Sequence, residues 1–218
     1  MQLPFTVAQF YGVFRDYNTA LWPAQVALLA LALAALVLVA WRRPASGRVV
    51  SAILAFLWAW LALAYHVAFF AAINPLAYAF AALSLLGAAA FAWQGVVRGR
   101  LRFRPAADAR TALGVALVAY ALLVYPAWSV LAGHRYPALP TFGLPCPTTI
   151  YTIGLLAFAQ RPCPRGPLVA PVLWSFIGGQ AALLLDVPQD LGLLVAGVIG
   201  LGLIARARGP VPARQAQP

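Results

Sequence analysis

The sequence predicts an all-α integral membrane protein: a single bundle of about seven transmembrane helices, preceded by a short amphipathic helix. Hydrophobic residues make up 64% of the 218-residue chain and charged residues only 9%. A soluble domain carries about 25% charged residues, because most of its surface must meet water. The apolar residues also gather in runs near the length of about 20 residues that crosses a bilayer. Lipid is therefore the expected partner of most of the surface.

A short helix is predicted within residues 1–19, ahead of the first long apolar run. The apolar residues that fall on one face of this helix are Val7, Phe10, Tyr11 and Phe14. Thr6 and Gln9 have the spacing of a capping box at its start. A helix with an aromatic face, too short to span, is expected to lie in the lipid interface.

Residues 20–206 form the predicted transmembrane domain, and residues 207–218 a polar, proline-rich tail that we expect to be disordered. The seven predicted spans cover residues 21–41, 49–73, 75–97, 111–131, 141 or 147 to 159, 167–185 and 190–205. The fifth span is the weakest, because prolines and a glycine interrupt its start. The last span contains Ala196 and Gly200 at the spacing of close helix packing, which serves either packing within the chain or a homo-oligomer.

The arginines predict the orientation, because positively charged loops stay in the cytoplasm during insertion. Of the 15 basic residues, all arginine, only Arg15 and Arg135 fall outside four loops on one side. The arginines of those loops are Arg42, Arg43, Arg48, Arg98, Arg100, Arg102, Arg104, Arg110, Arg161, Arg165, Arg206, Arg208 and Arg214. A six-span chain would split these loops between the two sides. We therefore expect seven spans, with the amino terminus outside and the carboxyl terminus in the cytoplasm of a bacterium, across its inner membrane.

Several function classes lose support from the sequence. The net charge of +11 resides in short loops rather than on one basic surface, so we expect no nucleic-acid binding. Lysine is absent, which excludes a retinal Schiff base. The GxSxG, GxxxxGK[ST] and HExxH motifs are also missing. A disulfide between Cys146 and Cys163 is excluded, because a span separates them.

The predicted orientation gathers the unusual polar residues at the outer side. The candidate ligand-binding residues are His66, Asn74, His134, Cys146, Thr148, Thr149, Gln180, Asp186 and Asp190. Ionisable residues inside a membrane usually face the bundle interior or a wet cavity. His66, His134 and Cys146 also supply ligand types for a transition metal ion such as Zn or Cu. This convergence predicts an outward-facing polar site.

Each of these residues also has a simpler interpretation. His66 is either a ligand or proton relay, or a neutral imidazole bonded to a tyrosine or a carbonyl. Cys146 precedes a helix start, where the dipole favours a reactive thiolate, or it is an inert cysteine in a proline-stiffened loop. Asp186 and Asp190 either cap the last helix or accept a cation or proton near His66. His134 is either a ligand or a plain interfacial residue.

Three strings resemble a bacterial family of polytopic membrane proteins of unknown function. These strings are YHVAFFAAINP (65–75), GHRYPALPTFGLPCPTT (133–149) and DVPQDLGLLVAG (186–197). The resemblance implies a seven-helix inner-membrane protein and brings no established activity. A looser likeness links the chain to membrane hydrolases of the alkaline-ceramidase type, which hold zinc with three histidines. This chain has two histidines.

We therefore expect a small transporter or a protein that binds a metal or another ligand, with a small ion or molecule as its partner. The alternatives are a membrane-embedded, metal-dependent hydrolase that uses the same residues and an accessory subunit of a membrane complex.

Overall fold

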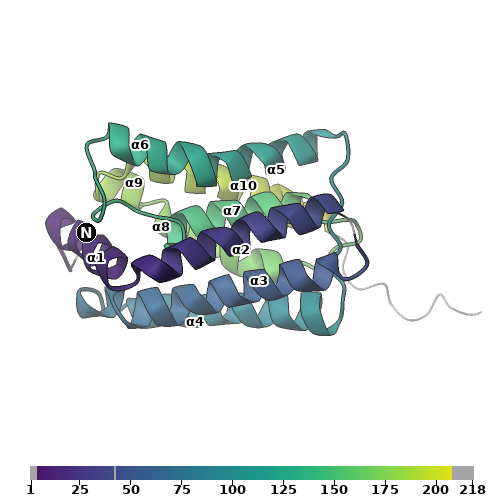
Figure 1. Cartoon of the computed structure of the whole chain (residues 1–218), viewed down its shortest axis with the longest axis horizontal. Helices are drawn as coiled ribbons and strands as arrows, with labels where there is room; N and C mark the ends of the chain where they lie inside the picture. Colours follow the sequence, from purple (N-terminus) through teal and green to yellow (C-terminus); the bar gives the residue numbers. More distant parts are fainter. Residues whose placement is uncertain (1–3, 42, 208–218) are drawn as a thin grey trace, which may run out of the picture.

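A computed structural model of the chain describes residues 4–41 and 43–207, so the predicted tail from residue 208 onward lies outside the described residues. Within these two ranges the structure is helical, and its β-type pairings are limited to two isolated bridges. The helices form one elongated bundle, with α1 (Val7–Ala20) at one end (Figure 1). The all-helical prediction is therefore confirmed.

The remaining helices follow the predicted spans closely. They are α2 (Trp22–Trp41), α3 (Ser46–Trp60), η1 (Leu61–Val67), η2 (Phe70–Ala72), α4 (Ala77–Ala90), η3 (Phe91–Val97), α5 (Ala109–Ala119), η4 (Tyr120–Val124), α6 (Tyr125–Leu131), α7 (Pro145–Ala157), α8 (Gly166–Gly178), α9 (Ala181–Leu184), η5 (Pro188–Asp190) and α10 (Leu191–Arg206). The segments η1, η3 and η4 are π-helical turns that continue the preceding α-helix. Such turns are rare and often occur at functional sites.

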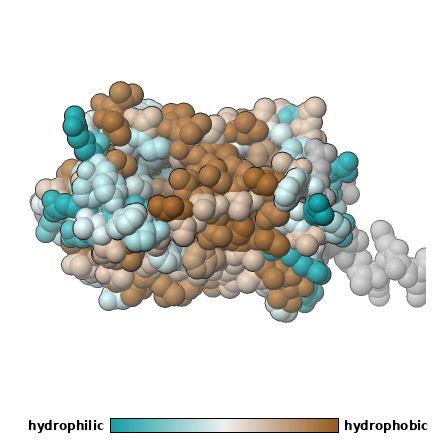
Figure 2. Space-filling model, viewed as in Figure 1, coloured by the Kyte–Doolittle hydropathy of each residue, from teal (hydrophilic) through white to brown (hydrophobic). Residues whose placement is uncertain are grey.

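Six continuous helical stretches among the described residues are long and apolar enough to cross a membrane. They are Trp22–Trp41, Ser46–Ala72, Ala77–Val97, Ala109–Leu131, Gly166–Leu184 and Pro188–Arg206. Figure 2 shows that hydrophobic residues form a broad band along the middle of the visible face, with hydrophilic residues at both ends. This pattern is consistent with a membrane protein.

The short helix α7 is the core of the bundle. All of its 13 residues except Cys146 are buried. At one end, the Tyr17 hydroxyl donates to the Gly143 carbonyl just before the helix, 3.2 Å away. At the other end, Phe103 forms a bridge with Ala159 just after the helix. The helix therefore runs from the α1 end of the bundle to the opposite end, although it is too short to count as a span by length.

The arginine-bearing loops meet at the end opposite α1. Arg110 Nη1 donates to the Ala159 carbonyl at 2.7 Å, and Arg165 Nε donates to the Ala207 carbonyl at 3.0 Å. The Gln160 amide donates to the Arg102 carbonyl at 2.7 Å. These bonds join three of the four predicted arginine loops, those before α5, after α7 and after α10, at one end of the bundle.

Helix α1 begins with the predicted capping box, in which Thr6 and Gln9 bond reciprocally. Its aromatic face differs from the expectation. Phe10 and Phe14 are buried against protein, and the Phe10 ring lies 6.1 Å from that of Phe70. Val7 remains 42% exposed. The bundle offers an aromatic surface of its own, so this face packs on the protein rather than on lipid.

The small residues of α10 serve contacts inside the chain. A Cβ at Gly197 would lie 3.0 Å from Phe176, and a Cβ at Gly192 or Gly200 would collide with Tyr120 or Val172. Gly202 has open space around it. Packing within the chain therefore explains most of this stripe, and a homo-oligomer through α10 stays a prediction.

Candidate functional site

A cavity of about 350 Å³ lies at the α1 end of the bundle; we name it the α1-end cavity. Its lining comes from α1, η1, η2, α4, α7, α8 and α9, together with Pro4, Phe5 and the chain just before α7. Three of the predicted site residues, Asn74, Cys146 and Gln180, lie in this lining. No Asp, Glu, Arg or His side chain belongs to the lining. The structure thus brings part of the predicted site to one cavity, in an uncharged setting.

Four side chains form what we name the aromatic wall of this cavity: Tyr65, Phe70, Phe80 and Trp174. The Tyr65 and Phe70 rings are stacked with centroids 5.7 Å apart, and the Phe80 and Trp174 rings meet edge to face at 5.2 Å. Aromatic pairs in these geometries contribute about 0.5–1.5 kcal/mol beyond their burial. The wall is therefore a packed set of rings from η1, η2, α4 and α8, in which the Trp174 ring stands nearly perpendicular to that of Phe80.

His66 lies in contact with the aromatic wall and has no hydrogen-bond partner. Its ring is fully buried, and the ring centroid lies 4.9 Å from that of Trp174. Both imidazole nitrogens and the Trp174 Nε1 lack a partner among the described residues. The simpler interpretation of His66, a bond to a tyrosine or carbonyl, is therefore wrong. Unpaired buried polar atoms are uncommon and call for an explanation.

Asp190, Tyr125 and Cys146 form a second buried group, which we name the Asp190 network. The Tyr125 hydroxyl donates to Asp190 Oδ1 at 2.6 Å, and Cys146 Sγ donates to Asp190 Oδ2 at 3.4 Å. Asp190 is 1% exposed. Among the described residues the one ion pair is Arg15–Asp16, so Asp190 is held by hydrogen bonds from neutral groups. The network joins α6, α7 and η5, which leads directly into α10, and Cys146 connects it to the α1-end cavity.

Asp190 occupies the N-cap position of α10, so only a capping bond from its side chain is contradicted. Its side chain makes no capping bond to α10, because both carboxylate oxygens are used by Tyr125 and Cys146. Asp186 is exposed and has a positive φ of 56°. Its carbonyl accepts a bond of 3.1 Å from the Tyr11 hydroxyl. Burial raises the pKa of Tyr11 to about 12, with help from the two aspartates, so this donor stays protonated.

The predicted metal ligands lie in separate environments. His134 stacks on Tyr11 with ring centroids 4.0 Å apart, whereas His66 packs on the aromatic wall and Cys146 bonds to Asp190. No group of three or more His, Cys, Asp or Glu side chains could hold a metal ion in the described part of the chain. Both cysteines are free. The Zn or Cu site predicted from His66, His134 and Cys146 is therefore not assembled in the structure.

The two threonines after Cys146 differ in their bonding. Thr148 Oγ1 accepts a bond of 3.2 Å from the Gly143 amide and so fixes the turn before α7. Gly143 needs to be glycine, because its φ is +98° and a Cβ there would meet Leu28. Thr149 Oγ1 is buried and has no partner in the part of the chain that the structure describes. Gln180 is exposed at the rim, and Asn74 Oδ1 accepts from the Leu76 amide at 3.1 Å.

Asn18 fastens the loop before α7 to α1. Its Nδ2 donates to the carbonyls of Pro137 and Leu139 at 2.6 and 2.8 Å. Its Oδ1 accepts from Thr141 Oγ1 at 2.8 Å and from Gln25 Nε2 at 2.5 Å. This amide is fully buried, and its four bonds all go to residues outside α1, so it fixes the position of that loop.

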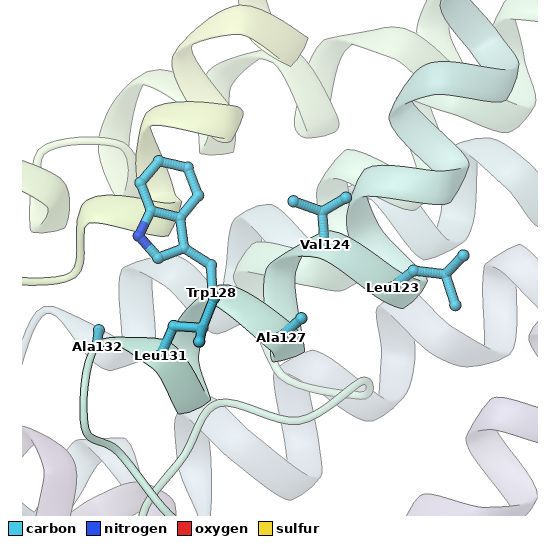
Figure 3. Close-up of a pocket in the computed structure, with 6 residues that line it drawn as sticks. All are labelled: Leu123, Val124, Ala127, Trp128, Leu131 and Ala132. Carbon is cyan, nitrogen blue, oxygen red and sulfur yellow. The ribbon is translucent and has the colours of Figure 1, made fainter.

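A second hollow, of about 620 Å³, lies on the surface of η4 and α6 (Figure 3). It is lined by Leu123, Val124, Ala127, Trp128, Leu131 and Ala132, all from one helical stretch and its end. Leu123 and Leu131 are 67% and 87% exposed. None of the predicted site residues lines it, so this hollow is an open apolar surface rather than part of the site.

Trp174 and Tyr125 belong to the site, although the sequence did not single out either as a candidate. Both sit in long apolar stretches, where an aromatic residue is ordinarily a packing residue. A small residue one helical turn after each aromatic residue was a weak indication of its role. Gly178 leaves space beside the Trp174 indole, and the Ser129 hydroxyl donates to the Tyr125 carbonyl. Their partners are distant in sequence, so the spacing of residues could not reveal them.

Six helices of membrane-crossing length around a buried seventh helix, with an uncharged cavity at one end, define a polytopic helical protein of the kind found in membranes. The chain belongs to a family of unknown function (DUF6064), whose model matches residues 7–210. The expected membership in a family of unknown function is confirmed. Comparisons with curated proteins and with solved structures found no match.

Proposed function

We propose that this chain is a multi-pass membrane protein that binds a small organic molecule in the α1-end cavity, as a small transporter or a ligand-binding protein. The observation that carries the proposal is the cavity itself. Its volume of about 350 Å³ falls within the range of about 300–1,000 Å³ that small-molecule sites occupy. Its lining is largely apolar with a few polar groups, which is also typical of such sites.

We further propose seven spans, with α1 on the outer side of a bacterial inner membrane. The supporting observation is the position of α7, which runs between the two ends of the bundle and places the loop of Arg161 and Arg165 with the other arginine loops. Positively charged loops favour the cytoplasmic side. Helix α7 faces protein all round, so it need not match the full thickness of a bilayer.

An organic ligand is favoured over the metal ion of the sequence analysis. The cavity lining contributes one thiol and two amides, Asn74 and Gln180, but no carboxylate or imidazole. Transition metals in proteins are bound mainly by thiolate, imidazole and carboxylate groups. No observation favours the metal-dependent hydrolase, and an accessory subunit gains no specific support either.

Alkylation of Cys146 tests the cavity. The chain has two cysteines, so Cys163→Ser leaves Cys146 as the single thiol. Ala181 lines the cavity, whereas its neighbour Ala182 does not. In this background Ala181→Phe should slow alkylation of Cys146 by N-ethylmaleimide several-fold, and the matched control Ala182→Phe should leave the rate unchanged. Equal rates in the two variants would show that Cys146 is not reached through the cavity.

The orientation is tested with two exposed loop positions in a cysteine-free background. Arg135 lies at the α1 end and Arg100 at the opposite end, and both side chains are exposed. Arg135→Cys should react with an impermeant thiol reagent added outside intact cells, and Arg100→Cys only after permeabilisation. The reverse pattern would invert the proposed topology.

A further inference from the structure

One side of the α1-end cavity opens where the helices turn their exposed apolar surface outward. Leu76, at the start of α4, lines the cavity and is 61% exposed. Ile177 on α8 and Leu184 on α9 also line it and are 37% and 52% exposed. Helices α4 and α8 both belong to stretches of membrane-crossing length. In the proposed topology this opening meets acyl chains, so a ligand enters from the bilayer.

The lining selects against charge. It contains no ionisable side chain other than the Tyr65 hydroxyl and the Cys146 thiol. A charged group brought into such a site without a counter-charge would lose its hydration with no compensation, which is costly. The ligand is therefore uncharged.

One buried hydrogen-bond donor on a residue of the cavity lining is left unused by the described part of the chain. Trp174 is 6% exposed, and its Nε1 has no partner among the described residues. This nitrogen lies 3.0 Å from the position that a Cβ on Gly178 would take, and Gly178 also lines the cavity. An indole N–H donates only, so its natural partner is an acceptor such as a carbonyl oxygen.

The aromatic wall favours a flat ring over a flexible chain. Its rings are held in stacked and edge-to-face pairs, with Phe70 and Phe80 stacked at 6.4 Å. Aromatic rings pack best against other planar groups in offset-stacked or edge-on arrangements. A planar ligand can pack against these rings in an edge-on or offset arrangement.

We propose that the α1-end cavity binds an uncharged, lipid-soluble molecule with a planar carbonyl-bearing ring, of the quinone type. The molecule enters from the bilayer between α4 and α8–α9, and one carbonyl oxygen accepts from Trp174 Nε1. This inference rests on the proposed function, because it names the ligand class of the same cavity.

The test uses the full chain with Cys163→Ser, reconstituted in lipid nanodiscs, and the alkylation rate of Cys146 as the readout. The probe is decylubiquinone, whose ring positions are all substituted. Decylbenzene, with a ring and no carbonyl, and decanoate, with a charged end, are the comparison compounds. Decylubiquinone should slow alkylation at least about fivefold at saturation, and the other two should have little effect. Equal protection by decylbenzene would overturn the proposal.

Trp174→Phe keeps an aromatic ring and removes the donor. It should weaken decylubiquinone binding about fivefold, the loss expected for one neutral hydrogen bond. Gly178→Ala places a methyl group beside the same nitrogen and should also weaken binding. Gly202→Ala, in open space, is the matched control. Unchanged binding in Trp174→Phe would show that Trp174 does not hold the carbonyl.

The two proposals fail in different ways. If no probe protects Cys146 but Ala181→Phe still slows its alkylation, the cavity exists and the ligand class is wrong. If Ala181→Phe has no effect, the cavity itself is not the route to Cys146.

Discussion

Two buried polar regions lie next to each other at the α1 end, and they are built in opposite ways. In the Asp190 network each carboxylate oxygen receives a donor, from Tyr125 at 2.6 Å and from Cys146 at 3.4 Å. Beside the aromatic wall, both His66 nitrogens and Trp174 Nε1 have no hydrogen-bond partner among the described residues. Cys146 belongs to the first region and also lines the cavity of the second.

The difference indicates that the Asp190 network has a structural role, whereas the region beside the aromatic wall is open to a ligand. A buried polar group that is left unpaired costs about 1–3 kcal/mol, so a protein keeps one only where something else repays that cost. In the Asp190 network the buried groups of α6, α7 and η5 bond to one another, which offsets this cost. The Trp174 Nε1 and both His66 nitrogens have no such partner among the described residues, and of the two residues only Trp174 lines the cavity.

The largest expected effect is the loss of stability in Asp190→Ala. This change leaves the buried Tyr125 hydroxyl and the Cys146 thiol without an acceptor, so we expect the free energy of unfolding to fall by about 3 kcal/mol. Asp190→Asn, which keeps one carbonyl acceptor, should cost less. Unfolding by SDS titration in mixed micelles measures both. A loss below about 1 kcal/mol in Asp190→Ala would remove the structural role of this network.

Asn18→Ala should cost about 2 kcal/mol, because it removes a fully buried amide with three bonds to the distant loop before α7 and one to Gln25. The loop of residues 133–144 should also become easier to cleave by proteases. Thr19→Ala, an exposed neighbour, is the control. Protease resistance equal to that of the parent chain would show that other contacts hold this loop.

Cys163 gives a reference thiol outside both regions, in the loop before α8. Burial raises its pKa to about 11, although Arg110 and Arg161 oppose the shift. The thiolate is the reactive form, and below the pKa its fraction grows about tenfold per pH unit. In Cys146→Ser protein, alkylation of Cys163 should therefore accelerate about tenfold per unit from pH 7 to pH 10. A plateau near pH 9 would indicate a thiol with an ordinary pKa.

The smallest expected effect is the change in stability on replacing His66, beside the aromatic wall. His66→Leu removes two unpaired nitrogens from an apolar setting, and replacing such a group by an apolar one is often neutral or stabilising. We expect the free energy of unfolding to change by less than about 1 kcal/mol, or to rise. Trp174→Phe also removes buried ring volume, so it should cost more than His66→Leu. A loss of several kcal/mol in His66→Leu would mean that its nitrogens have partners after all.

The sequence predicted the helices well and the site only in part. Apolar runs of membrane length, the Thr6–Gln9 capping box and the grouping of the arginines are local patterns, so they could be read without a structure. Helix α7 was the least certain element because Pro140 and Gly143 interrupt its start, and the structure shows that it is short and enclosed by protein.

The site depends on pairs that are far apart in sequence. Cys146 and Asp190 were both candidates, but their bond joins residues 44 positions apart, and Tyr125 lies 65 positions from Asp190. A capping bond from the Asp190 side chain was the natural local interpretation, and a distant tyrosine overturned it. Trp174 could not be predicted as a site residue, because an indole in an apolar run gives no indication in the sequence that its nitrogen lacks a partner.

The most direct test follows the Trp174 indole by ¹⁵N–¹H NMR in nanodiscs, with the signal assigned through its loss in Trp174→Phe. Before any ligand is added, the signal should report an N–H without a hydrogen bond. On addition of decylubiquinone it should shift downfield, while the other six indole signals stay in place. A Trp174 signal that does not move at saturating decylubiquinone would contradict the assignment of this donor to a ligand.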